Sequence, residues 1–95
     1  MAENVRDRAQ FYREVLEASR ESGVRLAQEV LLEMDRRGMS AALARALEGV
    51  RRHLEEALGC SPPEVDDGSE AFAAAAVAEW TRIRAAMGSG KPGLA

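Results

Sequence analysis

The chain has 95 residues, of which 46% are hydrophobic and 31% charged, and it carries a formal net charge of −3 and one cysteine. This length suits a single domain with a modest core, and interspersed charges of both signs favour a folded chain over a disordered one. The weak negative charge excludes a general electrostatic attraction to nucleic acid or to an anionic membrane, and a single cysteine excludes an intramolecular disulfide.

The chain carries no recognisable targeting or membrane segment. Its first ten residues, MAENVRDRAQ, lack the basic segment and apolar run of a secretory signal. The longest apolar run, residues 71–78, is far shorter than the roughly 20 residues that a membrane span needs. We therefore expect a cytoplasmic protein with no membrane partner.

An apolar pattern with helical spacing begins near residue 4. In the stretch 24–34, VRLAQEVLLEM, apolar residues cover nearly half the helix circumference, which is typical of a helix with neighbours on several sides. The spacing keeps its phase through Ser22 and Gly23, although glycine inside a helix costs about 1 kcal/mol relative to alanine. We predict one helix over about 4–37, with small residues where another helix crosses it. The alternative is a break at Gly23, which would give four shorter helices and a monomer.

Glycine and serine residues indicate where the second helix lies. Gly38 is a typical helix end, and Ser40 is a typical N-cap for an antiparallel helix over about 40–58. Gly59 indicates the end of that helix, and Cys60 stands where an apolar capping contact is expected.

The last third of the chain predicts one more helix. Residues 61–68 begin with the spacing of a capping box, but Gly68 follows within two turns, so we interpret this segment as a connector. Ser69 is then the N-cap of an Ala-rich helix over about 70–87, and residues 88–95 form a flexible C-terminal tail.

These elements predict an all-α fold, a small helical bundle in one domain over residues 1–87. The first helix would be about 50 Å long and the later two about 27 Å each, so the later helices cannot cover its N-terminal half. An uncovered apolar stripe is typical of an interaction surface, and we predict that a second, antiparallel copy completes the bundle. The candidate interaction residues are Val5, Tyr12, Val15, Leu16, Ser19 and Gly23.

The residues with side chains suited to catalysis or metal binding form no recognisable catalytic or metal-binding pattern. His53 has no ligand at metal spacing on its own helix, and a thiol–imidazole pair with Cys60 would lack a third orienting group. Asp66, Asp67 and Glu70 do not follow the EF-hand spacing and suit the positive end of a helix. We therefore predict no enzyme activity, no catalytic residues, no cofactor and no metal.

The leading functional hypothesis is a non-catalytic protein–protein interaction module, such as an adaptor, docking or regulatory subunit, that forms a homodimer through its N-terminal helix. Under this hypothesis the module can also bind another protein, which the sequence does not identify. One alternative is a nucleic-acid-associated regulator, against which the acidic residues of the second helix argue. Another is a small apolar ligand binder or accessory enzyme subunit. The arginines of the nucleic-acid alternative are Arg36, Arg37, Arg45, Arg51 and Arg52.

Overall fold

The computed structural model describes the backbone of residues 2–89 and the side chains of residues 7–87. Helices account for nearly all of this part of the chain, which contains no strand, so the predicted all-α class is confirmed. A 3₁₀ turn joins the first two α-helices, and a π-helical turn continues the second. In chain order the elements are α1 (Ala2–Glu29), η1 (Leu31–Glu33), α2 (Arg36–Arg52), η2 (His53–Ala57) and α3 (Pro62–Ser89).

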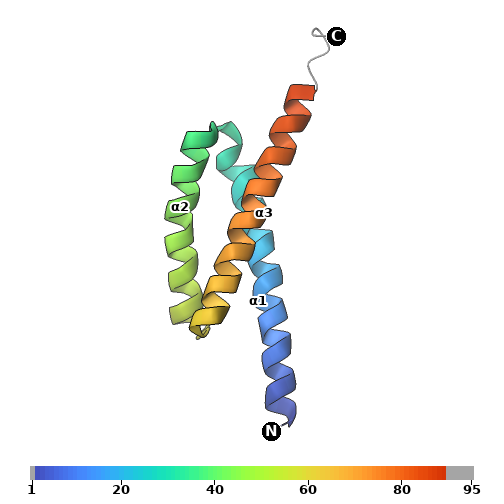
Figure 1. Ribbon diagram of the computed structural model, residues 1–95, viewed down its shortest axis with the longest axis vertical. Helices are drawn as coiled ribbons and strands as arrows, with labels where there is room; N and C mark the ends of the chain where they lie inside the picture. Colours follow the sequence, from blue (N-terminus) through green and yellow to red (C-terminus); the bar gives the residue numbers. More distant parts are fainter. Residues whose placement is uncertain (1, 90–95) are drawn as a thin grey trace.

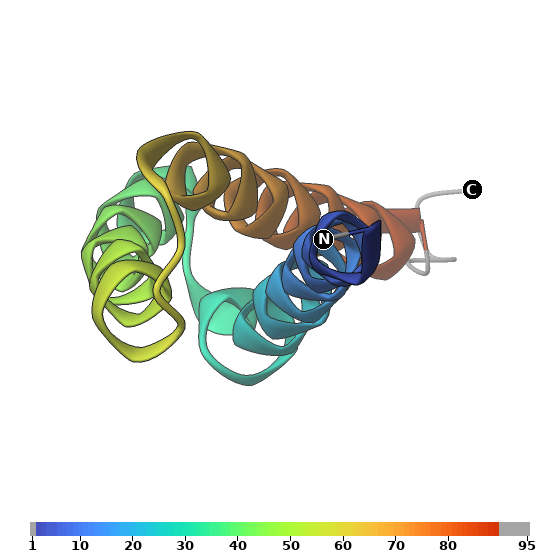
Figure 2. The same ribbon diagram turned by 90° about the horizontal axis from the view of Figure 1, so that it is seen from below.

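The helices α1 and α3 lie side by side and run in the same direction, whereas α2 runs antiparallel to both (Figure 1). Seen end-on, the three helices occupy the corners of a triangle (Figure 2). The backbone of α2 approaches α3 but stays farther from α1. The molecule measures 63 × 23 × 17 Å with a radius of gyration of 16.3 Å, against about 12 Å for a spherical domain of this length. The bundle is therefore elongated, and one end of α1 and one end of α3 project from it in opposite directions.

The first helix is continuous through Gly23, as predicted. Gly23 lies against the backbone of α3, where a Cβ atom would be 2.3 Å from the Phe72 carbonyl oxygen and 3.1 Å from the Ala76 nitrogen. Because no side chain fits into that space, the glycine is needed where the two helices cross. The prediction of a close helix crossing is confirmed, and the alternative of a broken helix is wrong.

The end of α1 and the start of α2 differ from the prediction. The helix ends at Glu29 rather than at residue 37, and Gly38 lies in the first turn of α2 instead of ending α1. Asp35 is the N-cap of α2, since its carboxylate accepts a hydrogen bond from the Gly38 nitrogen at 2.8 Å. Ser40 is therefore an interior residue of α2 and not its cap.

Contacts from α3 hold the link between α1 and α2 in place. The Trp80 indole donates a hydrogen bond to the Met34 carbonyl at 3.2 Å. The Arg84 guanidinium donates to the carbonyls of Leu32 and Met34 at 3.3 and 3.1 Å. These donors pair carbonyl groups that a continuing helix would itself have used as hydrogen-bond acceptors. The preceding residue, Leu31, is fully buried. A packed tertiary contact thus ends α1 at a point where the sequence has no helix breaker.

The end of the second helical segment agrees with the prediction. Gly59 has a φ of 66°, in the left-handed region that ends many helices. The Cys60 nitrogen donates to the Leu54 carbonyl at 2.9 Å, and the buried Cys60 side chain packs with Leu54 and Val65. The bond reaches one residue farther back than the bond of a Schellman ending, because η2 is a π-helical turn. The left-handed glycine and the apolar contact of Cys60 nevertheless confirm the roles predicted for these two residues.

Helix α3 begins at Pro62, eight residues before the predicted start at residue 70. The Ser61 nitrogen donates to Glu64 Oε1 at 2.8 Å, so the capping box does start a helix. Gly68 lies inside α3 and is buried. Leu54 packs against it so closely that a Cβ atom there would be 2.8 Å from a methyl group of Leu54. The connector predicted over 61–68 is therefore wrong. The helix continues to Ser89, and the rest of the predicted tail lies outside the described residues.

Two adjoining groups of buried side chains form the core. Val15 is only 4% exposed, because the early start of α3 brings Val65 over it. The expectation that Val15 lies uncovered is therefore wrong. The larger group comprises Ala27, Leu31, Met39, Leu43, Phe72, Ala76 and Trp80, and the smaller one Val15, Leu54, Cys60 and Val65.

Candidate interaction surface

A shallow groove of about 510 Å³ follows the α1–α3 pair, and no residue of α2 lines it. We call it the outer groove. Its floor is apolar, with the half-buried Leu16 of α1 opposite a row of alanines on α3. Because alanine side chains are short, a helix laid in the groove would approach the α3 backbone closely. The lining residues are Tyr12, Leu16, Arg20, Asp67, Glu70, Ala71, Ala74 and Ala75.

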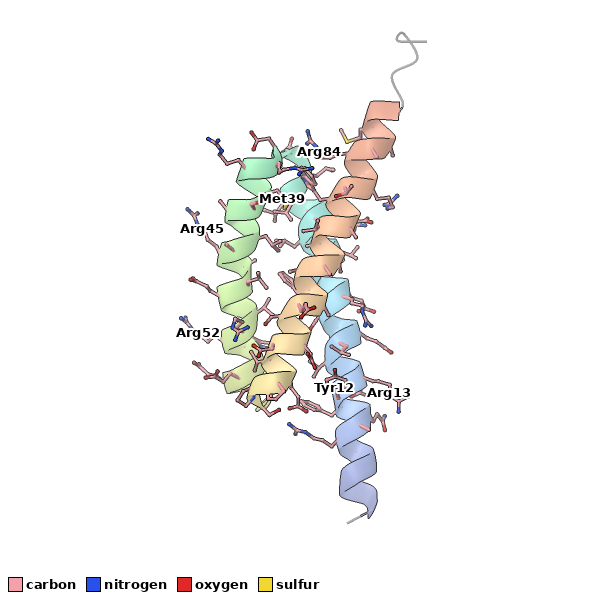
Figure 3. All side chains as sticks on the ribbon, viewed as in Figure 1. Tyr12, Arg13, Met39, Arg45, Arg52 and Arg84 are labelled. Carbon is pink, nitrogen blue, oxygen red and sulfur yellow. The ribbon has the colours of Figure 1, made fainter. Side chains whose placement is uncertain are left out.

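Tyr12 lies at one end of the outer groove in a fixed orientation, at the boundary of α1 and α3 (Figure 3). Its hydroxyl donates a hydrogen bond to Asp67 Oδ2 at 2.8 Å. This hydrogen bond, together with partial burial and the negative charge of Asp67, raises the pKa of Tyr12. The bond joins α1 to α3 and holds Asp67 Oδ2 toward Tyr12, while the carboxylate keeps its negative charge.

The two remaining charged residues of the outer groove have no ion-pair partner within the described part of the chain. Arg20 comes from α1 and Glu70 from α3, and both are exposed. The groove thus carries one positive group, Arg20, and two negative groups, Asp67 and Glu70, beside an apolar floor. Such a face can be electrostatically complementary to a copy of itself.

The structure gathers only some of the predicted interaction residues on one surface. Tyr12 and Leu16 line the outer groove, but Val15, Ser19 and Gly23 are buried within the chain. Ser19 and Gly23 serve the α1–α3 crossing, which corrects the expectation that these two residues and Val15 are open to a partner. The side chain of Val5 lies outside the described side chains.

Sequence reasoning did not place Arg20, Glu70 or the alanine row on the candidate surface. Arg20 follows Tyr12 and Leu16 at intervals of four residues, so helical spacing alone places it on the same stripe. No such spacing in the sequence indicates that residues of α3 line the same groove, because their position depends on which helix lies beside α1.

The arginines of the nucleic-acid alternative all lie on α2. Arg45 and Arg52 project from it on the side away from α3 (Figure 3). The acidic Glu48 lies between them on that face, at intervals of three and four residues. Arg51 points elsewhere and pairs with Asp66 of α3 at 2.9 Å. The basic residues are therefore interrupted by acids rather than forming a continuous patch.

A second, smaller cleft of about 130 Å³ separates α1 from η2, with Phe72 of α3 also lining it. We call it the inner cleft. Its lining is mainly apolar, and the exposed His53 stands at its edge. Cys60, the other residue weighed for chemistry, is buried, and burial raises the pKa of its thiol. A raised pKa disfavours the reactive thiolate, so this arrangement gives no support to a thiol–imidazole pair.

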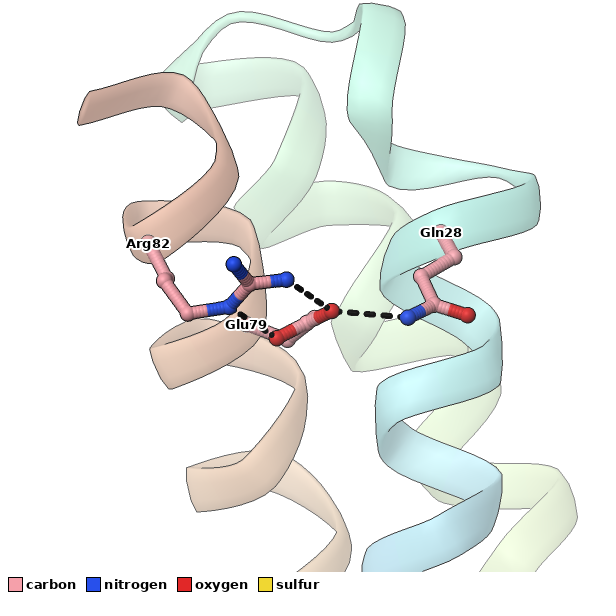
Figure 4. Close-up of polar contacts among 3 residues, drawn as sticks. All are labelled: Gln28, Glu79 and Arg82. Carbon is pink, nitrogen blue, oxygen red and sulfur yellow. Dashed lines mark hydrogen bonds and ion pairs between the residues drawn. The ribbon is translucent and has the colours of Figure 1, made fainter. Parts of the chain in front are cut away.

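A polar cluster joins the C-terminal end of α1 to α3 (Figure 4). Glu79 accepts two hydrogen bonds from Arg82, both at 2.8 Å, and one from Gln28 at 2.7 Å. These bonds, those from Arg82 first, lower the pKa of Glu79 from its ordinary value of 4.5 to about 2. The cluster holds the two helices together and leaves Glu79 ionised at neutral pH.

In the part of the chain that the structure describes, no group of three or more His, Cys, Asp and Glu side chains is arranged to hold a metal ion. No helix within these residues combines the length and the apolar character needed to cross a bilayer. Trp80, which is 6% exposed, belongs to the core rather than to a ligand site. Comparison of the chain with protein-family models, with curated proteins and with solved structures finds no match.

Proposed function

We propose that the protein is a non-catalytic helical interaction module that forms a homodimer through the outer groove. The observation that carries this proposal is the open apolar floor of the groove, where Leu16 of α1 faces the alanine row of α3. Full burial of a leucine side chain is worth about 1.5–3 kcal/mol, so covering this floor would favour association.

A second copy is the occupant that the geometry favours. The paired helices α1 and α3 form one two-helix layer, and two such layers packed face to face make a four-helix bundle with α2 of each copy on the outside. A two-fold interface uses the same surface on both copies, so it needs a face that can complement itself. The outer groove meets this requirement with its short alanine side chains and with charged groups of both signs.

Replacing Leu16 by Asp tests the proposal. We expect the unchanged protein to be a dimer at micromolar concentration in light scattering, and L16D to dissociate because a carboxylate would be desolvated in the groove. Circular dichroism should show that L16D remains helical, since Leu16 is only half-buried.

The matched control is Leu58→Asp, which places the same charge at a leucine that is 41% exposed and lines the inner cleft instead. L58D should remain a dimer. A monomeric unchanged protein, or an L16D variant as dimeric as L58D, would contradict the proposal.

The inner cleft supports a second candidate function, the binding of a small apolar ligand. Its volume of about 130 Å³ is close to that of an apolar cavity, about 150 Å³, known to hold a benzene molecule. The probe is benzene, which should raise the melting temperature of the unchanged protein. Val50→Trp would fill the cleft and should abolish that rise, and a melting temperature unaffected by benzene would refute this candidate.

A further inference from the structure

We infer that Arg20 of one copy pairs with Glu70 of the other across the outer groove, and that this contact occurs twice in the dimer. The inference rests on the proposed function and names the charged contact that gives the self-association its specificity. It concerns two residues that make no ion pair within the described part of their own chain.

Elimination among the charged residues of the groove leads to this pair. Three of the lining residues are charged. Asp67 keeps its negative charge, but the hydrogen bond from Tyr12 holds its Oδ2 toward α1 of its own chain. Arg20 and Glu70 remain, one on each helix, beside alanines that cannot provide a counter-charge. When a second copy covers the floor, both groups lose part of their water, and an opposite charge on the partner would offset that loss.

Two-fold symmetry turns one favourable contact into two. In an isologous interface, if Arg20 contacts Glu70 of the partner, then Glu70 contacts Arg20 of the partner. Charged groups at the rim of an interface govern its specificity and register more than its affinity. Reversing one of them therefore places like charges together at both contacts.

Charge reversal and mixing test the inference. The variants are Arg20→Glu and Glu70→Arg, and the readout is the dimer dissociation constant from sedimentation at low salt. Each variant alone should dimerise at least about tenfold more weakly than the unchanged protein, because like charges face each other twice. An equimolar mixture of the two should recover dimers, since each mixed contact again joins an Arg to a Glu.

The mixture separates contacts between copies from contacts within one chain. In R20E the residues at positions 20 and 70 are both acidic, and in E70R both are basic, so an intrachain pair stays repulsive in the mixture. Arg45→Glu on α2 is the control for the charge change and should dimerise normally.

Two results would overturn the inference while leaving the proposed function intact. One is an unchanged dissociation constant for both single variants, and the other is weakened variants that fail to associate when mixed. An unchanged protein that stays monomeric would overturn the proposed function and this inference together.

Discussion

The two helix interfaces of this bundle are built in opposite ways. Where α1 crosses α3, the backbones approach so closely that a Cβ atom on Gly23 would be 2.3 Å from a carbonyl oxygen of α3. Where α2 and its continuation η2 pack, large side chains such as Met39, Leu43 and Leu54 fill the space instead. Added side-chain atoms should therefore lower the stability of the fold at the α1–α3 crossing, whereas removed atoms should lower it where α2 packs.

The polar contacts follow the same division. The α1–α3 pair is joined along its length, by Arg8 with Glu64, by Tyr12 with Asp67 and by Gln28 with Glu79. In the described residues, a single ion pair, that of Arg51 with Asp66, joins α2 to α3. Close backbones bring opposite side chains within hydrogen-bonding reach, whereas α2 is held mainly by apolar burial.

Removing atoms from the α2 interface should have the largest effect. Leu43→Ala should destabilise the fold by about 2–5 kcal/mol, because it leaves a cavity beside buried core residues. Leu47→Ala, at a half-buried position on the same helix, should cost less. Urea denaturation of both variants measures the difference, and equal losses would contradict the burial assigned to these two leucines.

Adding one carbon atom at the α1–α3 crossing should have the next largest effect. Gly23→Ala should destabilise the fold by about 1–3 kcal/mol, because the new methyl group overlaps backbone atoms of α3. Gly49→Ala is the matched control, since α2 leaves open space there. It should stabilise the protein by about 0.5–1 kcal/mol through better helix propensity. Effects of the same sign in thermal unfolding would mean that α1 and α3 do not cross at Gly23.

The smallest effect concerns the polar cluster of Gln28, Glu79 and Arg82, near the C-terminal end of α1. The pKa of Glu79 is lowered to about 2, so its bonds to Gln28 and Arg82 contribute stability above about pH 4.5. That contribution is lost as the pH falls toward 2, where the carboxylate takes up a proton in the folded state. Glu79→Gln should therefore lower the melting temperature at pH 7 but have little effect at pH 2. A difference that is constant across this range would show that the ionised carboxylate of Glu79 is not what stabilises the cluster.

The sequence alone determined the helical class, the continuity of α1 and the end of the second helical segment. Apolar spacing that keeps its phase through Gly23 is a local property, and so is the preference of Gly59 for a left-handed conformation. The stripe that contains Tyr12 and Leu16 was likewise visible from spacing, and both residues line the outer groove.

The tertiary structure decided where α1 ends, where α3 begins and which helix covers α1. A glycine such as Gly68 looks the same in the sequence whether it ends a helix or lets a neighbouring side chain pack closely. Only the position of Leu54 distinguishes these two roles. The end of α1 depends on Trp80 and Arg84, about 50 residues away in the chain. The early start of α3 then buries Val15 and leaves Leu16 in an open groove. These features depend on contacts between distant segments, which local spacing does not encode.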